Sequence, residues 1–445
     1  MSPPSRLAAD AIVRVLRHAG YEACLVGGCV RDHALNVSPV DFDVATSASV
    51  DAIRSLFPQT VPVGAAFGTV LVIRDGASYQ VSTFRGDGTA RGDALRRDFT
   101  INAMFLDPET GEVIDFAGGR DDLAARIVRS VGSAEDRFAE DPVRILRMVR
   151  LAAALRFSIA AATEKAAADM TPSLSSVSPE RIRDELVSIF TGPDPVRGLD
   201  LLDRLGILSL FLPEVEEMKG VAQPPAYHPE GDVYAHTRLA LSLLKEPSTV
   251  LVFGVLFHDL GKPATMTVAD RIHFYGHEEM GAEMARKICS RLKFSNADTE
   301  SIVLLVRHHG DLCRAGEMRP GKLARMLDRP TFEEEMELHR VDALAGPGDL
   351  STWEFLKAAR EARRAAGPPK APLLTGKDLI EIGFAPGPVF REILESIEEE
   401  REEGGITGAE EAREWVLRRF GRAGRPAHPV EPVGPLDNPG PGDLH

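Results

Sequence analysis

Two aspartates separated by one residue form the first candidate catalytic group. Asp41 and Asp43 flank Phe42 in the segment DFDVAT. Residues i and i+2 of a strand lie on the same face, so both carboxylates are expected to point at one spot. Adjacent carboxylates repel each other, and Mg²⁺ is commonly held by one or two carboxylates together with substrate phosphates. The pair alone is also typical of a solvated strand edge.

A glycine pair upstream of these aspartates favours phosphate chemistry. The segment LVGGCVRD (25–32) predicts a strand, a turn at Gly27-Gly28 and a helix start that carries Arg31. Glycines let the backbone approach phosphate oxygens, and the amides at a helix N-terminus favour anions. A glycine pair by itself is more often a plain turn, but together with the two aspartates it strengthens the magnesium interpretation.

The segment RRDFTINAMF (96–105) is the third candidate motif. We interpret Arg97 as a ligand of a triphosphate, with Asp98 and Asn102 near the sugar. The plain alternative is a helix start that is capped by Thr100 or Asp98.

An arginine-rich segment could read a base. In EDPVRILRMVR (140–150), the residues Asp141, Arg144, Arg147 and Arg150 are each three apart and predict a polar stripe on one helix. A carboxylate can accept from the exocyclic amine of cytosine or adenine while a guanidinium donates to the ring acceptors. G and U would leave these groups unpaired, at about 1–3 kcal/mol per contact. The alternative is a solvated amphipathic helix.

Hydrophobic patterning predicts the elements that position these residues. A helix is expected over 6–19, ended by Gly20, and another over 50–57. Strands are expected over 23–26, 42–45, 69–73 and 79–84, so the region to about residue 131 is mixed α/β. From about residue 136 onward the pattern predicts successive helices, connected by segments that contain Pro and Gly.

Composition limits the class of protein. The 445 residues predict roughly three domains, and 44% hydrophobic with 27% charged residues is typical of globular proteins. The longest apolar run, 250–257, is far below the about 20 residues that span a bilayer, and no secretion signal is evident. We therefore expect a cytoplasmic protein without a membrane partner. A net charge of −15 does not exclude RNA, because arginines concentrate between residues 91 and 156.

Taken in order, these motifs resemble the class II tRNA nucleotidyltransferases, whose catalytic head is shared with bacterial poly(A) polymerases. The resemblance also includes GGRDDL (118–123), PERIRDEL (179–186) and LLTGKDLIEIGFAPGP (373–388). It implies an α+β fold with a DNA polymerase beta-like nucleotidyltransferase head, followed by an all-helical neck, an HD-type body and a tail. We place these domains at 1–132, 133–200, 201–366 and 367–420, and the Pro- and Gly-rich segment 421–445 is expected to be disordered.

The resemblance also implies roles for single residues. Asp41 and Asp43 would bind Mg²⁺ and carry catalysis. The nucleotide would be bound by Gly28, Arg31 and Arg97, and its base would be read by Asp141 and Arg144, with Arg147 and Arg150 beside them. The implied substrates are CTP and ATP, and the implied partner is the 3′ end and acceptor arm of tRNA.

A histidine-rich region resembles the HD superfamily of metal-dependent phosphohydrolases. The match rests on the doublet in LFHDLGKP (256–263), and its ligand pattern implies a site formed by His236, His258, Asp259 and Asp342. Such mixed ligands suit a second divalent or transition metal. The alternative is a domain that serves only as body structure.

One departure from the family pattern bears on the product. After VSTFR (81–85), family members carry a flexible loop and a further strand, whereas here only GDGTARGDAL (86–95) precedes the Arg-Arg-Asp motif. Ten residues cannot form both. Because enzymes without this loop resemble CC-adding types, we favour CC addition. Four alternatives stay open, namely full CCA addition, a poly(A) polymerase, an HD phosphohydrolase with a relic head, and a non-catalytic RNA-binding protein. The oligomeric state also stays open.

Overall fold

The computed structural model describes residues 3–61, 68–224, 228–269, 271–365 and 371–421. The chain divides into two compact units, residues 1–310 with 337–350 and residues 311–336 with 351–445. The finer division into head, neck, body and tail stays a prediction. The expected disordered segment lies, from residue 422 onward, outside the described residues. None of the described helices combines the length and apolar character that a bilayer crossing requires.

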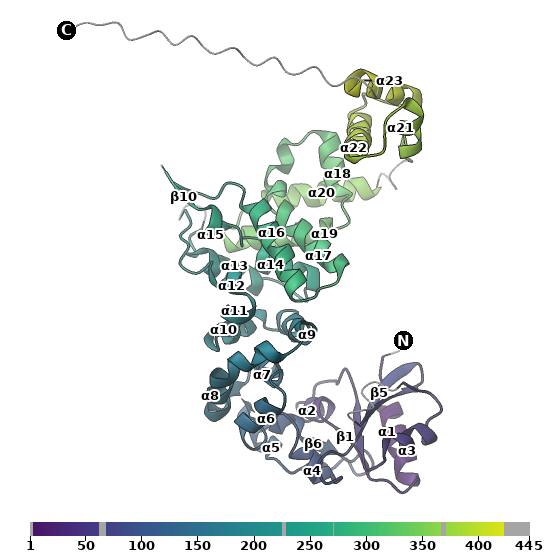
Figure 1. The fold of residues 1–445 in the computed structure, drawn as a ribbon, viewed down its shortest axis with the longest axis vertical. Helices are drawn as coiled ribbons and strands as arrows, with labels where there is room; N and C mark the ends of the chain where they lie inside the picture. Colours follow the sequence, from purple (N-terminus) through teal and green to yellow (C-terminus); the bar gives the residue numbers. More distant parts are fainter. Residues whose placement is uncertain (1–2, 62–67, 225–227, 270, 366–370, 422–445) are drawn as a thin grey trace, which may run out of the picture. The chain divides into compact units, whose positions relative to one another are not determined.

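A seven-stranded sheet organises the N-terminal part of the first unit (Figure 1). Its order is β3-β4-β5-β2-β1-β6-β7, and all neighbouring strands are antiparallel except β2 and β5. The strands are β1 (Ala23–Val26), β2 (Asp43–Thr46), β3 (Thr60–Val61), β4 (Thr69–Arg74), β5 (Ala77–Thr83), β6 (Met104–Leu106) and β7 (Val113–Asp115). The four predicted strands are confirmed to within two residues at each end.

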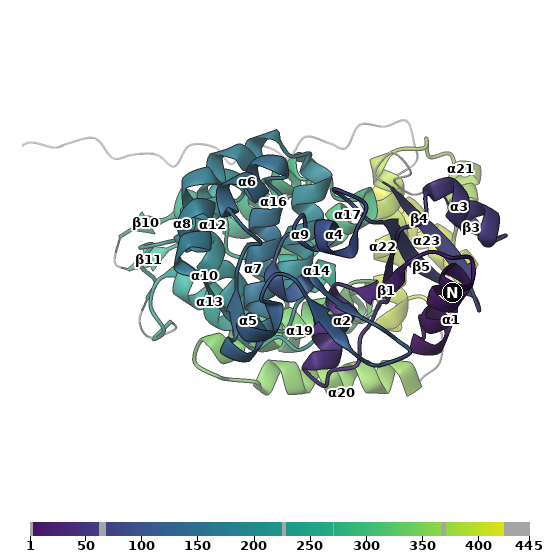
Figure 2. The same cartoon turned by 90° about the horizontal axis from the view of Figure 1, so that it is seen from below.

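The two faces of the sheet bury different side chains. Leu25 and Val44 pack with α1 (Arg6–His18) and α3 (Val50–Leu56), the two helices expected from the sequence, which lie together beside the sheet in Figures 1 and 2. The alternate residues Cys24 and Ala45 pack on the other face with Phe84 and with α4 (Ala90–Ala94). This period of two fixes which side chains of β1 and β2 face each layer.

Helices form most of the remainder of the first unit. They are α2 (Gly28–Ala34), α5 (Gly119–Ala125), α6 (Ala134–Glu140), α7 (Arg144–Leu155), α8 (Ala161–Met170), α9 (Pro179–Phe190), α10 (Pro195–Arg204), α11 (Ile207–Phe211), α12 (Pro213–Glu216), α13 (Val233–Ser242), α14 (Thr249–Phe257), α15 (Lys262–Thr265), α16 (His277–Arg291) and α17 (Asn296–His308). Two short strand pairs, β8 (Ile127–Val128) with β9 (Ser158–Ile159) and β10 (Thr267–Val268) with β11 (Ile272–His273), interrupt the helices.

Every regular element among the described residues of the second unit is helical. Its helices are α18 (Pro320–Leu327), α20 (Ser351–Ala365), α21 (Gly376–Ile382), α22 (Pro388–Glu402) and α23 (Ala409–Phe420), while α19 (Phe332–Ala345) spans the sequence boundary between the units. Leu379, Ile393 and Val416 form a separate small core among α21, α22 and α23.

The single helix predicted over residues 140–150 is wrong. Helix α6 ends at Glu140, Asp141 is extended with φ −153° and ψ 98°, and α7 begins at Arg144. The reason is Pro142, whose ring disfavours the α conformation at the preceding residue. Asp141 therefore projects from a bend between two helices and does not belong to the arginine stripe of α7.

Candidate active site

The glycine turn, the strand that carries Asp43 and the Arg-Arg-Asp motif meet at one point. Strand β1 ends at Val26, which is paired with Asp43 at the start of β2. Gly27 has φ +81°, a conformation that glycine adopts without steric cost, and α2 starts directly after it. A Cβ atom on Gly27 would lie 3.6 Å from both Asp43 Oδ2 and Arg97 Nη1. The backbone here passes within van der Waals distance of a carboxylate and a guanidinium.

The two aspartates have the donor chemistry for a divalent cation. Phe42 and Val44 are buried, whereas Asp41 is exposed and Asp43 is half-buried. Burial raises the pKa of Asp43 to about 6, Arg97 opposes this, and the charge of Asp41 adds to the rise. A divalent cation would hold such a carboxylate in its ionised form, and oxygen atoms are the ligands that Mg²⁺ takes. The residues therefore fit this metal, and their assignment stays a prediction.

Arg31 joins α2 to the segment that carries the Arg-Arg-Asp motif. Its Nη1 donates to Asn102 Oδ1 at 2.9 Å, and its Nη2 lies 2.6 Å from Asp32 Oδ1. A Cβ on Gly28 would lie 3.6 Å from Arg31 Nη2, so the guanidinium folds over the first turn of α2. Asn102 ends a short 3₁₀ helix at Thr100–Asn102. The predicted nucleotide ligands Gly28, Arg31 and Asn102 are thus brought together.

A buried carboxylate that the sequence analysis missed holds Arg97. Asp93 is 1% exposed, and its oxygens accept from Arg97 Nε at 2.9 Å and Arg85 Nε at 2.7 Å. Burial alone would raise the pKa of Asp93, but Arg97 and Arg85 together hold it below the usual value. The Asp93–Arg97 spacing of four residues was the available signal. Helix α4, which carries Asp93, is the one regular element between residues 84 and 99, all of which are described.

The predicted base-reading residues lie against the head. Arg144 is buried and donates through Nη1 to Glu140 Oε2 and to the Arg137 carbonyl, both at 3.0 Å. Its Nη2 lies 3.5 Å from the carbonyl oxygen of Arg96. The segment 96–98 therefore has the Asp43–Arg97 centre on one side and α7 on the other.

Helix α9 organises the remaining side chains of this group. Arg181 Nη2 donates to Asp141 Oδ2 at 2.7 Å. Glu185 pairs with both Arg147 and Arg150, each at 3.3 Å, and Arg147 Nη1 also lies 3.7 Å from Asp98 Oδ2. Neither Arg181 nor Glu185 was expected from the sequence to contribute, although both lie in PERIRDEL (179–186). All four base-reading candidates are thus held by acid–base pairs.

A second centre brings together the four residues of the HD pattern. His236 Nε2 lies 2.8 Å from Asp342 Oδ1, and His258 Nε2 lies 3.2 Å from Asp259 Oδ2 and 3.9 Å from Asp342 Oδ1. His236 comes from α13, the His258–Asp259 doublet follows α14, and Asp342 comes from α19. Burial lowers the pKa of His258, but Asp259 and Asp342 outweigh it and raise that pKa to about 8.

Two buried polar atoms in this centre have the chemistry of metal ligands. His258 Nε2 and Asp259 Oδ2 have no aligned hydrogen-bond partner among the described residues. The Lys262 ammonium lies 2.7 Å from Asp259 Oδ2, a distance that pairs the charges without the alignment of a hydrogen bond. Orphaned buried atoms of this kind are costly unless a metal or water satisfies them. Imidazole and carboxylate donors fit a divalent or transition metal.

Two further histidines extend the centre. His277 and His309 approach Asp259 Oδ1 at 3.8 and 3.9 Å, and their Nε2 atoms are 3.2 Å apart. The Nδ1 atoms of His258, His277 and His309 each contact the carbonyl oxygen three residues earlier, at 2.7–2.8 Å. These contacts direct all three Nε2 atoms inward. The histidines of HFYGH and RHHG were the signal that could have assigned them.

Comparison with known proteins identifies three family models along the chain. "Poly A polymerase head domain" matches residues 23–129, "Probable RNA and SrmB- binding site of polymerase A" matches 156–219, and "HD domain" matches 226–346. An A-adding tRNA nucleotidyltransferase of Deinococcus radiodurans is 32% identical over 425 residues, covering 89% of this chain and 95% of the relative. A CCA-adding enzyme of Geobacillus thermodenitrificans is 40% identical over 232 residues, and this match spans 49% of the chain and 57% of that enzyme.

A solved structure has the same architecture. The CCA-adding enzyme of Bacillus stearothermophilus, crystallised in complex with CTP, aligns with a TM-score of 0.71 at 28% identity. The alignment covers 94% of this chain and 98% of that enzyme. The expected α+β fold with a nucleotidyltransferase head and an HD domain is confirmed.

Proposed function

Because this chain belongs to the tRNA nucleotidyltransferase family that shares the poly(A) polymerase head, we propose that it adds CMP to the 3′ end of tRNA from CTP and stops after two additions. One observation carries the proposal. Asp43, Gly27 and Arg97 meet at one point, and Arg144 reaches the same segment from the other side. A triphosphate and its base can thus be bound by adjoining parts of one site.

In the proposed reaction the 3′-oxygen of tRNA forms a bond to the α-phosphorus of CTP. The bond from that phosphorus to the β-phosphate oxygen breaks, pyrophosphate leaves, and the hydroxyl proton passes to solvent. Magnesium, held by Asp41 and Asp43, would supply positive charge beside the reacting phosphate. Arg31 and Arg97 neutralise the triphosphate, and Asn102 and Asp93 fix the directions of these two guanidinium groups.

Selection of cytosine is assigned to Asp141 and Arg144. The Asp141 carboxylate accepts from the exocyclic amine, and Arg144 donates to the ring acceptors. UTP and GTP present the opposite pattern and leave these groups unpaired. The acceptor arm of tRNA is assigned to the helical region after the head, where the RNA-binding family model matches.

Helix α4 supports CC addition over full CCA addition. The family's flexible loop is replaced by a helix of five residues whose Asp93 is tied to Arg85 and Arg97. A segment fixed in this way has little freedom to re-form the pocket for ATP. The test is incubation of tRNA that ends at the discriminator base with CTP and ATP, separately and together. Two added residues support the proposal, three with both nucleotides contradict it, and a long A tail indicates a poly(A) polymerase.

The carboxylate assignment has its own test. Asp43→Ala should abolish CMP incorporation while tRNA binding persists, and the exposed Asp51→Ala on α3 serves as the matched control. Near-normal turnover of the Asp43 variant would refute the catalytic assignment.

A second activity, phosphate-ester hydrolysis, is favoured by the buried imidazole and carboxylate of His258 and Asp259, whose Nε2 and Oδ2 atoms have no aligned hydrogen-bond partner among the described residues. A water oxygen would form a bond to phosphorus, the ester P–O bond would break, and the water proton would go to the leaving alcohol. A metal held by His236, His258, Asp259 and Asp342 would supply Lewis acidity. His258→Ala should lose bound metal, measured by mass spectrometry of the purified protein, and lose phosphatase activity while CMP incorporation persists. Unchanged metal content would refute this assignment.

A further inference from the structure

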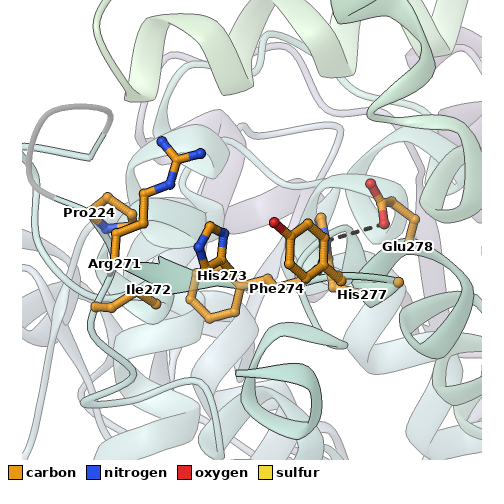
Figure 3. A pocket seen from close by; sticks show the side chains of 9 residues that line it. Pro224, Arg271, Ile272, His273, Phe274, His277 and Glu278 are labelled. Carbon is orange, nitrogen blue, oxygen red and sulfur yellow. Dashed lines mark hydrogen bonds and ion pairs between the residues drawn. The ribbon is translucent and has the colours of Figure 1, made fainter. Parts of the chain in front are cut away.

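The head carries an exposed aromatic ring beside the candidate active site. Phe116 directly follows β7 and is 39% exposed, although phenylalanine is among the residues most often buried. The nucleotidyl transfer proposed above uses Asp43 and Arg97 but not this ring. The cavity between Arg271 and Glu278, about 410 Å³ in volume, is a separate feature that belongs with the second centre (Figure 3). Phe116 belongs instead to the sheet that carries Asp43.

A row of directly opposed residues leads across this sheet from the candidate magnesium ligand to the ring. The pairs are Asp43 with Val26, Val26 with Phe105, and Phe105 with Ile114, on strands β2, β1, β6 and β7. Opposed residues share one face, and two strand spacings separate Asp43 from Phe105, or about 10 Å. The ring of Phe116 meets that of Phe105 in a T-shaped contact, with centroids 6.3 Å apart. Phe116 therefore lies on the catalytic face, within reach of one nucleotide from Asp43.

The turn that carries the ring is fixed before any ligand binds. Asp115 Oδ1 accepts from the amide of Ala117 at 3.0 Å, and Oδ2 accepts from the amide of Arg120 at 2.9 Å. Phe105, on which Phe116 packs, is fully buried. A ligand that stacks on Phe116 would therefore lose little affinity to ordering of the protein.

Positive charge lies on two sides of the ring. The guanidinium of Arg97 lies 5.5 Å from the ring centroid of Phe105. The guanidinium of Arg120, an exposed residue four positions after Phe116, donates to the carbonyl oxygen of Val113, and no carboxylate among the described residues forms an ion pair with it. An aromatic ring between two cationic groups matches the base and the phosphates of an RNA strand.

The transfer brings two bases to the metal, and only one of them has been given a binding group. The incoming base is assigned to Asp141 and Arg144. The second base belongs to the 3′-terminal nucleotide of tRNA, whose 3′-oxygen attacks the α-phosphorus. This base is the discriminator base in the first addition and a cytosine in the second, so its binding surface has to tolerate different bases. Stacking on an aromatic ring meets this condition, because every base has a π-face.

We propose that Phe116 stacks on the 3′-terminal base of tRNA and thereby positions the attacking 3′-oxygen at the Asp43 centre. Arg120 supplies positive charge for the phosphate of the same nucleotide. The proposal rests on the nucleotidyl transfer proposed above and names the group that binds the end of its RNA substrate.

The test is a thermodynamic cycle between the ring and the base. One tRNA ends at the discriminator base, and a second is identical except that its terminal nucleotide keeps the ribose and lacks the base. Dissociation constants are measured for the full chain with Mg²⁺ and the α,β-methylene analogue of CTP, which blocks turnover. Loss of the base should weaken binding to the parent protein at least about fivefold.

Three variants assign this difference to the ring. Phe116→Leu keeps an apolar side chain against Phe105 but has no π-face, so it should bind the two tRNAs equally. Phe116→Tyr should restore the difference. Leu7→Ala is the control, because Leu7 is 77% exposed on α1, which packs on the other face of the sheet, and this variant should keep the full difference.

The outcomes separate the stacking surface from the transferase. A Phe116→Leu protein that still distinguishes the two tRNAs, or that binds both more weakly by the same factor, overturns the proposal. Weaker binding of the CTP analogue in this variant without tRNA would place the incoming base on Phe116 and also overturn it. A cycle with the expected result, in a parent protein that incorporates no CMP, supports the stacking surface and refutes the proposed transfer.

Discussion

Replacement of Asp93 by asparagine should have two linked effects. It should make α4 open more often, and it should weaken the binding of CTP. The Asp93 carboxylate, 1% exposed, accepts from Arg97 and Arg85 at 2.7–2.9 Å. Asparagine has nearly the same shape and retains one acceptor oxygen, but it removes the negative charge between two guanidinium groups. The substitution therefore tests the charge and leaves the packing of α4 in place.

The size of the effect follows from the exposure of the two arginines. Arg85 is 45% exposed at its side chain, so its pair is screened by water and contributes at most about 1 kcal/mol. Arg97 is 14% exposed, and removing one partner of a buried pair costs about 3–5 kcal/mol. Because asparagine still accepts one hydrogen bond, we expect about 2–3 kcal/mol in total. That is a 30- to 150-fold increase in the local opening equilibrium.

Amide hydrogen exchange measures this opening without assuming that the whole chain unfolds in one step. The amides of Asp93, Leu95 and Arg97 donate to the carbonyl oxygens of Thr89, Arg91 and Ala94, at the N-cap of α4 and within it, and they report directly. CTP binding, measured on the same protein, should weaken because Arg97 loses its fixed direction. The exposed Asp51→Asn on α3 should change neither quantity.

Two results would contradict this reasoning. Exchange within threefold of the parent protein would mean that Asp93 does not hold α4. Faster exchange with unchanged CTP affinity would mean that Arg97 either is not a triphosphate ligand or is oriented by other contacts.

Three further predictions follow from single contacts. The pKa of Asp93 is lower in the folded chain than in the unfolded chain, so the stabilisation of the fold by the ionised carboxylate is complete above about pH 4 and is lost as the pH falls through the folded pKa. The difference in amide exchange between the parent protein and Asp93→Asn should therefore shrink below about pH 4. Arg181→Ala releases Asp141 and should raise UMP misincorporation into tRNA about tenfold at similar tRNA affinity, measured by primer extension. Unchanged fidelity would exclude a role of Arg181 in holding Asp141 for base selection. Gly261→Ala places a methyl group 2.1 Å from the His277 carbonyl oxygen and should reduce metal content, whereas full occupancy would show that α16 can shift without cost.

The first part of the site could be predicted because its geometry is local. Gly27 and Gly28 require a turn, the preceding apolar run requires a strand, and the alternation around Phe42 separates two carboxylates from the core. Each of these inferences uses fewer than ten residues of sequence. The β1–β2 pairing then brings Val26 opposite Asp43, which alternation alone does not specify.

The missed residues depend on contacts between distant segments. Arg181 meets Asp141 across 40 positions, and His309 meets His277 across 32. Neither pairing has a periodic signature, because the spacing depends on how whole helices pack. The helix expected over 140–150 is interrupted for a different reason, because Pro142 breaks it although the apolar periodicity continues beyond it.

The contacts of Asp141 and Arg144 are compatible with the base-reading role proposed for them. Arg181 reaches Asp141 Oδ2, and the Val143 amide reaches Oδ1 at 3.3 Å, yet each carboxylate oxygen can accept a further bond. Arg144 has five N–H donors, of which its contacts to Glu140, Arg137 and Arg96 occupy only part. A cytosine can therefore bind without displacing these partners, so little conformational entropy is lost on binding. A mismatched base meets the same fixed groups and leaves their remaining acceptor and donor positions unpaired. If Asp141 and Arg144 read the base as proposed, Arg181 of α9 contributes to fidelity by holding Asp141, without touching the nucleotide.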